Sequence, residues 1–361
     1  MNDVLKRFDA WLSDDGPAAL VIREHLMPVE GEDGVLFPPT FAASEGKKQG
    51  GYNIDDFDDG LNCCLVDSVG SQANRIEPLF LGKKYARLVP QVTIKAGEKV
   101  VNLLEAGHRA GDAIVRCTPL QKELQDAFKA ARQGNVEPLA KVAPTSLVFG
   151  VWDSRDTQAK LPRLIASTVR GFNIQRLTRS AQFNPAAEFV NDGLLDDPAD
   201  KQAKDAYAQR GFVHVPASGS HGGVIATGGI RRDATLSLAA LRLLNAGPDA
   251  ERTAALRRYI LGLSLVAFTY RQPSYLRQGC NLVLNPDKPA EFVEVRNDGS
   301  RHPAKVSHDD AIAYATAAAL AFGVGEDRDV EFEKGRAQSD VLGDSADGEK
   351  SKAKGKGKGK P

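Results

Sequence analysis

Hydrophobic positions that recur every three or four residues predict several helices along the chain. The strongest pattern covers residues 118–134, where Thr118 caps, Pro119 occupies the first turn and Gly134 ends the helix. The same period predicts a moderate amphipathic helix over 3–12. It also predicts a pair of helices over 233–247 and 249–270, and an Ala-rich helix over 307–323. Gly247 should close the first of the pair, with Asp249 and Ser307 as caps.

Shorter runs of β-branched and aromatic residues predict strands between these helices. Such runs cover 145–152 and 291–296, and the segment 104–116 ends in a further strand-like run. A short strand, 224–227, lies between pairs of glycines. The mixture of both periods indicates an α+β or α/β protein.

Residues 160–170 carry two stripes if they are read as a helix. Leu161, Leu164, Ile165 and Thr168 form an apolar stripe, whereas Lys160, Arg163, Ser167 and Arg170 form one of cations and a hydroxyl. Such a cationic ladder suits the phosphates of a nucleic acid. The alternative is a solvated surface face, although such faces usually mix both signs of charge. The preceding loop, with Asp153, Arg155 and Asp156, offers further polar groups whose role the sequence leaves open.

A second polar face is predicted within residues 62–80. Its apolar seam is opposed by Ser71, Gln72 and Arg75, with Asn74 beside them. Hydroxyls, amides and arginine are common ligands of phosphate and ribose. A helix face that only meets water is the competing interpretation. Gly70 is unfavourable in a helix, so we expect another element, such as a helix, to approach it closely.

The glycine-rich stretch 216–237 contains Arg231 and Arg232 before a predicted helix start near Asp233 or Thr235. Glycines let a backbone approach an anion, but a flexible hairpin would look the same. The stretch has neither the P-loop nor the dinucleotide-binding spacing. His214 or His221 as a general acid/base, and a small-molecule site around Gly222, remain open alternatives.

Composition narrows the class of protein. With 42% hydrophobic and 26% charged residues, the chain is typical of soluble proteins, and no apolar run is long enough to span a bilayer. Four cysteines without a zinc or disulfide pattern favour reduced thiols in a cytoplasm. The 47 cations balance 47 acids, but six lysines lie in the last 12 residues. Any nucleic-acid site must therefore concentrate its cations locally.

These motifs, in this order, resemble the backbone subunit of type I-G (formerly I-U) CRISPR effector complexes, a RAMP-superfamily protein. The matching strings are FPPTFA, CLVDSVGSQANRIE, GVWDSRDTQAKLPRLIASTVRGFNI and GSHGGVIATGGIRRDATLSLAALRLL, within residues 37–323. The resemblance implies an α+β fold with a modified RRM-like, ferredoxin-like palm, helical insertions and a thumb-like protrusion. We expect one RNA-binding domain over residues 1–324, with the thumb within 184–223. From Gly325 to residue 361 the composition predicts a disordered tail.

The resemblance also implies a function in a CRISPR surveillance complex. Copies of the chain would bind side by side along a CRISPR RNA and present it to target DNA, together with a large subunit and a guide-end-binding subunit. Few aromatics and no RRM signature favour contacts to the RNA backbone. No catalytic residue, metal or cofactor is expected, although a RAMP-type endoribonuclease with a catalytic histidine is the alternative. The expected RNA-binding residues are Arg155, Lys160, Arg163, Arg170, Ser71, Gln72, Asn74, Arg75, Arg231 and Arg232.

Overall fold

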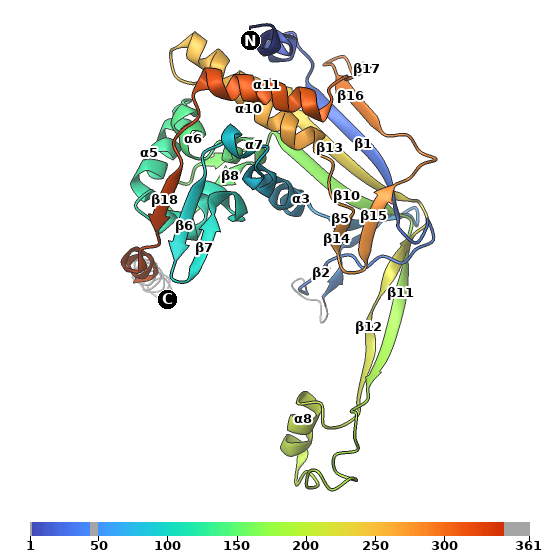
Figure 1. Cartoon of the computed structure of the whole chain (residues 1–361). Helices are drawn as coiled ribbons and strands as arrows, with labels where there is room; N and C mark the ends of the chain where they lie inside the picture. The colour runs from blue at the N-terminus through green and yellow to red at the C-terminus, as the bar shows by residue number, and fades with distance from the viewer. Residues whose placement is uncertain (1, 44–49, 343–361) are drawn as a thin grey trace, which may run out of the picture.

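A central antiparallel sheet organises the molecule (Figure 1). The structure, a computed structural model, describes residues 2–43 and 50–342. Within these residues the sheet has nine strands. Seven lie in the order β14 (Tyr275–Arg277), β15 (Cys280–Leu284), β1 (Ala19–Pro28), β13 (Ile230–Ser237), β10 (Ile165–Phe172), β5 (Asn62–Asp67) and β4 (Ile54–Asp56). The strand β16 (Glu291–Val295) pairs with both β1 and β17 (Arg301–Pro303).

The strand order is that of a ferredoxin-like sheet. Strand β1 lies between β13 and β15, and β13 in turn lies between β1 and β10, each pair antiparallel. Helical segments connect β1 to β10 and β13 to β15, while the arm described below connects β10 to β13. Two crossovers through helices and one hairpin-like connection give the split β-α-β arrangement. The predicted α+β class and ferredoxin-like core are confirmed.

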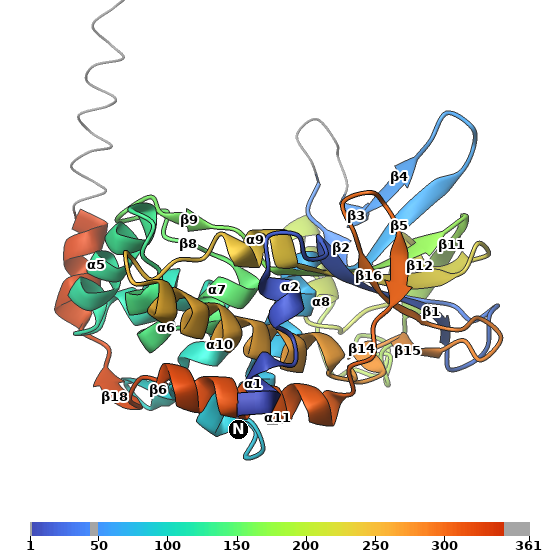
Figure 2. The same ribbon diagram turned by 90° about the horizontal axis from the view of Figure 1, so that it is seen from above.

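One face of this sheet carries the main helices (Figures 1 and 2). They are α3 (Val69–Ile76), α7 (Thr145–Phe149), α10 (Ala250–Thr269) and α11 (His308–Phe322). Leu20 of β1 and Leu236 of β13 lie opposite each other and belong to the same core as Tyr259 and Tyr314 of these helices. Because alternate residues of a strand face opposite ways, Arg23, Arg170 and Arg231 point to the other face.

A second lobe lies beside the helices. It contains η1 (Glu77–Leu81), η2 (Ala86–Leu88), β6 (Val92–Ala96), β7 (Lys99–Asn102), η3 (Leu103–Glu105), η4 (Arg109–Gly111), α4 (Ala113–Arg116), α5 (Gln121–Arg132) and α6 (Glu137–Val142). The strand β18 (Arg328–Glu331) runs parallel to β6, and a helix follows over residues 334–342. The prediction that the tail is disordered from Gly325 is therefore wrong for 325–342, because β6 offers an edge for pairing. Residues 343–361 lie outside the described residues.

A long arm projects from the body in Figure 1. It is a two-stranded ribbon of β11 (Ile174–Phe183) and β12 (Val215–Ala226), with α8 (Lys201–Gln209) at its end. None of the residues of α8 is buried. This arm spans residues 174–226 and so includes the segment 184–223 in which a protrusion was expected. Two further short strands, β2 (Thr40–Phe41) and β3 (Gly51–Tyr52), pair with each other.

The strongest helix signals are confirmed. Helix α5 (Gln121–Arg132) lies within 118–134, but Thr118 does not cap it and Pro119 is not in its first turn, because Leu120 is the N-cap. The Thr118 hydroxyl instead accepts a hydrogen bond from the Leu120 N–H at 3.2 Å, in the turn before the helix. Asp249 caps α10, and Ser307 forms a capping box with Asp310 at α11. The predicted strand over 291–296 is β16. No helix in the described ranges is both long and apolar enough to cross a bilayer.

Other segments change type. Residues 145–152 form α7 before a two-residue strand, and 113–116 are helical rather than extended. The helix predicted over 233–247 is largely the strand β13, followed by α9 (Leu238–Arg242), which Ser237 caps. The predicted helix over 3–12 is split into α1 (Asn2–Lys6) and α2 (Asp9–Leu12). Sheet partners on both sides outweighed local helix propensity at 233–237.

The helix predicted over 160–170 is also wrong. Lys160–Leu161 is the short strand β9, and β10 begins at Ile165. The period is therefore two, so Ser167 faces the core and Arg170 the open face. Over so short a run the apolar positions fitted both periods. The β-branched residues of β10 and its neighbours β5 and β13 decided the outcome.

Candidate nucleic-acid interface

The loop that precedes β9 is the closed end of a hairpin. Strand β8 (Val151–Trp152) pairs with β9 so that Trp152 lies opposite Lys160. The buried carboxylate of Asp153 accepts hydrogen bonds from the Thr157 N–H at 2.8 Å and the Thr157 hydroxyl at 2.6 Å. Asp156 accepts one from the Gln125 amide at 3.1 Å. The two acids therefore hold the loop, which answers the question that the sequence left open.

Gly150 brings the second cation of the hairpin into place. Its φ is +79°, and an added Cβ would lie 2.6 Å from Arg163 Cγ and 3.1 Å from the Arg163 backbone nitrogen. Only glycine fits such an approach without strain. The Arg163 Nε–H donates to the Phe149 carbonyl at 3.0 Å, yet the side chain remains exposed. Arg163 is thus held at the surface in a defined position.

A shallow groove beside this hairpin gathers cations and one aromatic ring. Its lining includes His108, Arg109, Trp152, Lys160 and Arg163. Trp152 is 56% exposed, and the Lys160 ammonium lies 5.6 Å from the centre of its ring. Exposed aromatic rings stack on bases, and cations beside them bind phosphates. We call this surface, together with the exposed Arg155 in the loop of the same hairpin, the hairpin groove.

Arg109 forms the floor of the hairpin groove. Its Nε lies 2.6 Å from a carboxylate oxygen of Glu77, and its guanidinium donates to the Gly150 carbonyl at 3.3 Å and to the Asn74 side-chain oxygen at 3.1 Å. Burial raises the pKa of Glu77 to about 7, although the neighbouring guanidinium opposes this shift. Burial also lowers the pKa of Arg109. The pair fixes Asn74 of α3 against the edge of the groove.

The predicted polar face of α3 is turned mostly inward. The fully buried Asp67 accepts hydrogen bonds from the Ser71 hydroxyl at 2.7 Å and the Gln72 amide at 2.6 Å, and Arg75 lies 3.6 Å away. Gln72 also accepts a bond from the Ser167 hydroxyl at 2.9 Å. These three residues of α3 therefore tie it to the sheet. Of the four α3 residues predicted to bind RNA, Asn74 alone is exposed.

The expected close neighbour of Gly70 is missing. Among the described residues, the only atom within 4 Å of an added Cβ is the hydroxyl oxygen of Ser68, in the same turn, at 4.0 Å. No second helix packs there, so that expectation is wrong. The backbone of α3 is open at this point.

Arg170 and Arg231 form a separate pair on the open face of the sheet. They lie opposite each other in neighbouring strands. Arg170 donates to the Thr168 hydroxyl at 2.8 Å, and Arg231 pairs with Asp233 at 2.8 Å and lies 4.8 Å from the centre of the Phe172 ring. Arg232 points to the helical face, where it is buried against Glu24 at 2.6 Å.

The structure thus divides the residues predicted from the sequence. Lys160 and Arg163 line the hairpin groove, Arg155 is exposed in the loop of the same hairpin, and Asn74 is bonded to Arg109 on the groove floor. Arg170 follows Arg163 by seven residues, roughly 23 Å of extended chain, and belongs to another face. The prediction that these cations form one continuous stripe is wrong, because it assumed helical spacing.

Three groove residues, Trp152, Arg109 and His108, received no role from the sequence. The ring of Trp152 was seen only as part of a polar loop, and Arg109 received no role. An aromatic residue directly before the DSRD string was the available signal for the first. Arg109 gives none, because its position depends on Glu77 and Gly150, which are distant in sequence.

The two histidines proposed as catalysts lie on the arm. The ring nitrogens of His214 lie 2.8 Å from the Asn184 side-chain oxygen and 2.7 Å from Glu188. His221 lies 3.2 Å from the Gly50 carbonyl and packs on Tyr52. Within residues 2–43 and 50–342, no group of three or more His, Cys, Asp or Glu side chains is placed to hold a metal ion.

Comparison with protein families gives one match. The family described as CRISPR-associated protein GSU0053 matches residues 20–176. No curated protein matches the chain. The matched segment runs from β1 to the first residues of β11, so it contains α3 and the whole hairpin groove. Over residues 20–176, the chain is therefore similar to the GSU0053 family of CRISPR-associated proteins.

Proposed function

We propose that this protein binds CRISPR RNA as a backbone subunit of a surveillance complex. The hairpin groove is the observation that carries the proposal. It combines an exposed indole ring with Arg155, Lys160 and Arg163 in a family associated with CRISPR systems. A stacking platform beside cations is the usual way to hold single-stranded RNA without reading its sequence.

The charges around the groove support binding through the sugar–phosphate backbone. Among the described residues, Arg155 and Lys160 are exposed and neither has an ion pair, in contrast to Arg176 of the arm, which pairs with Asp56. A cation without an ion pair can bind a phosphate and release its counterion without first breaking a salt bridge. A subunit that grips phosphates in this way accepts any guide sequence.

The remaining parts of the proposal are supported by the resemblance of the sequence motifs to a CRISPR backbone subunit. Copies of the chain would lie side by side along the guide, and the arm of residues 174–226 would act as the thumb that separates its segments. The bound guide would pair with target DNA, beside a large subunit and a guide-end-binding subunit. The role is structural rather than catalytic. The rival role, an endoribonuclease using His214 or His221, would require RNA cleavage that either substitution to alanine abolishes.

The test is a triple charge reversal in the hairpin groove. We expect Arg155→Glu, Lys160→Glu and Arg163→Glu together to lower affinity for single-stranded RNA by at least about 100-fold in filter binding at low salt, because three phosphate contacts are lost and three repulsions gained. The slope of log affinity against log salt should become shallower by about two to three.

A matched control reverses three cations on the β16–β17 hairpin. Arg296→Glu, Arg301→Glu and Lys305→Glu change the net charge equally, outside the groove. This variant should retain most of the affinity. Equal losses in the two variants would mean that only the overall charge matters, and an unaffected groove variant would move the RNA site elsewhere.

A further inference from the structure

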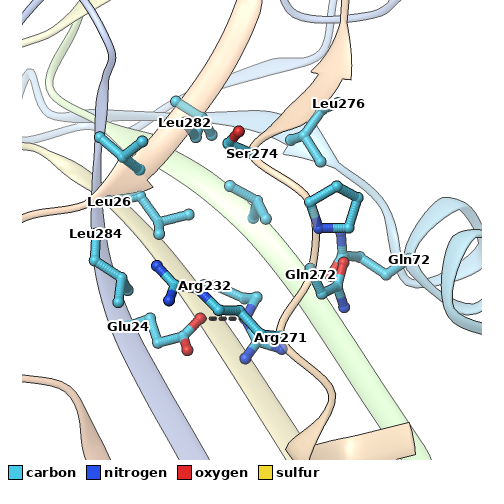
Figure 3. A pocket seen from close by; sticks show the side chains of 13 residues that line it. Glu24, Leu26, Gln72, Arg232, Arg271, Gln272, Ser274, Leu276, Leu282 and Leu284 are labelled. Carbon is cyan, nitrogen blue, oxygen red and sulfur yellow. Dashed lines mark hydrogen bonds and ion pairs between the residues drawn. The ribbon is translucent and has the colours of Figure 1, made fainter.

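A second cavity lies between the central sheet and the segment that follows α10 (Figure 3). It measures about 220 Å³. Leu26, Leu276, Leu282 and Leu284 supply its apolar wall, and Gln272, Arg271 and the ion pair of Glu24 with Arg232 supply its polar side. The cavity is smaller than the 300–1,000 Å³ typical of sites for drug-sized ligands, so it suits a single ring system or one side chain.

Gln272 is the unusual residue of this cavity. Both polar atoms of its carboxamide are buried, and neither has a hydrogen-bond partner among the described residues. Leaving a buried donor and acceptor unpaired costs about 1–3 kcal/mol for each group. The neighbouring Gln72, by contrast, has its oxygen bonded to Ser167 and its nitrogen bonded to Asp67. The free carboxamide therefore points to a ligand that offers both an acceptor and a donor.

The charge around the cavity favours an anionic ligand. Two guanidinium groups line the cavity, those of Arg232 and Arg271, against one carboxylate, that of Glu24. The lining therefore carries an excess of one positive charge. Arg232 is 93% buried and fixed by Glu24, whereas Arg271 is exposed and makes no ion pair in the described part of the chain. A phosphate attached to the ligand would find Arg271 at hand.

The cavity and the hairpin groove lie on either side of α3. Gln72 lines the cavity, and two residues later Asn74 is bonded to Arg109 on the floor of the groove. The open backbone at Gly70 belongs to the same short helix. One helix of eight residues thus separates the cavity from the groove.

We propose that this cavity is a seat for one nucleobase of the bound RNA, held by the Gln272 carboxamide. The proposal rests on the proposed function. Each of the four RNA bases presents an acceptor beside a donor on its Watson–Crick edge, in one order or the other. A carboxamide offers the complementary pair in either order when it rotates by 180°. The seat therefore accepts every base, which suits a protein that holds any guide.

The experiment uses the full-length protein and single-stranded RNA that contains 4-thiouridine. Ultraviolet crosslinking followed by mass spectrometry maps which peptides touch a base. We expect crosslinks to the peptide over residues 271–277 and to the peptide that contains Trp152. Gln272→Leu should reduce the first at least about fivefold, leave the second unchanged and lower total RNA affinity by about tenfold. Gln133→Leu, on an exposed helix end, is the matched control.

A second variant distinguishes loss of the base seat from misfolding of Gln272→Leu. Leu284→Trp fills the cavity from its partly exposed rim without touching Gln272, and it should abolish the same crosslink. Circular dichroism and thermal unfolding check both variants. Adenosine and cytidine monophosphates at millimolar concentration test whether a free nucleotide occupies the seat. Stabilisation by these nucleotides without crosslinks from RNA would overturn the assignment to bound RNA.

The two proposals fail in different ways. If wild-type protein binds no RNA, or if the groove variant binds normally, the proposed function is wrong. If RNA binds through the groove but Gln272→Leu and Leu284→Trp leave crosslinks and affinity unchanged, the base seat alone is wrong. If both variants weaken association between copies at equal RNA affinity, the cavity takes a protein side chain and the base seat is again rejected.

Discussion

Individual side chains decide how the hairpin groove is built. Gly150 permits the approach of Arg163, and Asp153 closes the loop behind Trp152. Buried acids fix the neighbouring polar side chains. Asp67 holds three residues of α3 toward the interior, and Glu77 holds Arg109 in place. At this scale the exposed cations are few, and their positions depend on contacts between segments distant in sequence.

Glu77 should make stability depend on pH. Its pKa is about 7 in the folded protein and near 4.5 when unfolded, so between these values the folded state holds a proton that the unfolded state has lost. The free energy of unfolding should therefore fall as pH rises from about 5 to 7, by up to roughly 1.4 kcal/mol per pH unit from this group.

Denaturant unfolding at several pH values measures this slope. Glu77→Gln, which cannot ionise, should remove that part of the slope. Glu123→Gln, in an exposed ion pair with Arg328, should leave it in place. An unchanged slope in Glu77→Gln would mean that the carboxylate stays ionised beside Arg109 throughout this range.

Trp152 should contribute stacking to RNA affinity. We expect Trp152→Ala to cost about 1–3 kcal/mol of binding free energy, because one base loses its platform. Trp152→Phe should restore most of the loss, since it keeps an aromatic face. Filter binding measures both. Full affinity in Trp152→Ala would leave the groove as a purely ionic surface.

At the scale of elements, the outer part of the arm is held together by its own residues. Its tip is held by local contacts, with Phe212 packed on both Phe189 and Tyr207, and α8 buries none of its residues. The base of the ribbon contacts the body, where Val224 bridges Leu36, His221 lies against Gly50 and Arg176 pairs with Asp56. The arm is therefore suited to contacts outside its own chain.

Replacement of residues 185–213 by a short Gly-Ser turn tests whether the body depends on this outer part. The midpoint of thermal unfolding should change by less than about 2 °C, because no core residue is removed. Affinity for RNA long enough for one copy should persist, while complexes with several copies on longer RNA should be lost. A large drop in the midpoint would show instead that the arm supports the body.

At the scale of the whole molecule, one side of the sheet is covered by α10 and α11 and a mixed array of charges lies on the other. Arg23, Asp233 and Arg231 form a chain of ion pairs on this open face. Such mutually neutralised charges hold polyanions less well than the unpaired cations of the groove. The net charge of zero is thus distributed unevenly, as a local nucleic-acid site requires.

Binding to RNAs of increasing length tests the assembly as a whole. The number of bound copies, measured by native mass spectrometry, should rise in steps with RNA length. Affinity should fall steeply with salt and change less than about threefold between unrelated sequences. A constant stoichiometry of one copy would contradict side-by-side assembly while leaving RNA binding intact.

The sequence by itself determined the class of fold, the long helices with their caps and the local excess of cations around residues 155–170. These features depend on local periodicity and on end signals such as Asp249 and Ser307. Only the tertiary structure decided that residues 165–172 form a strand, because the partners β5 and β13 lie far away in sequence. It also decided which polar residues bond to other residues of the chain and so do not face solvent. Asp67 bonds to Ser71 and Gln72 and pairs with Arg75. No local sequence pattern predicts that an acid will be buried.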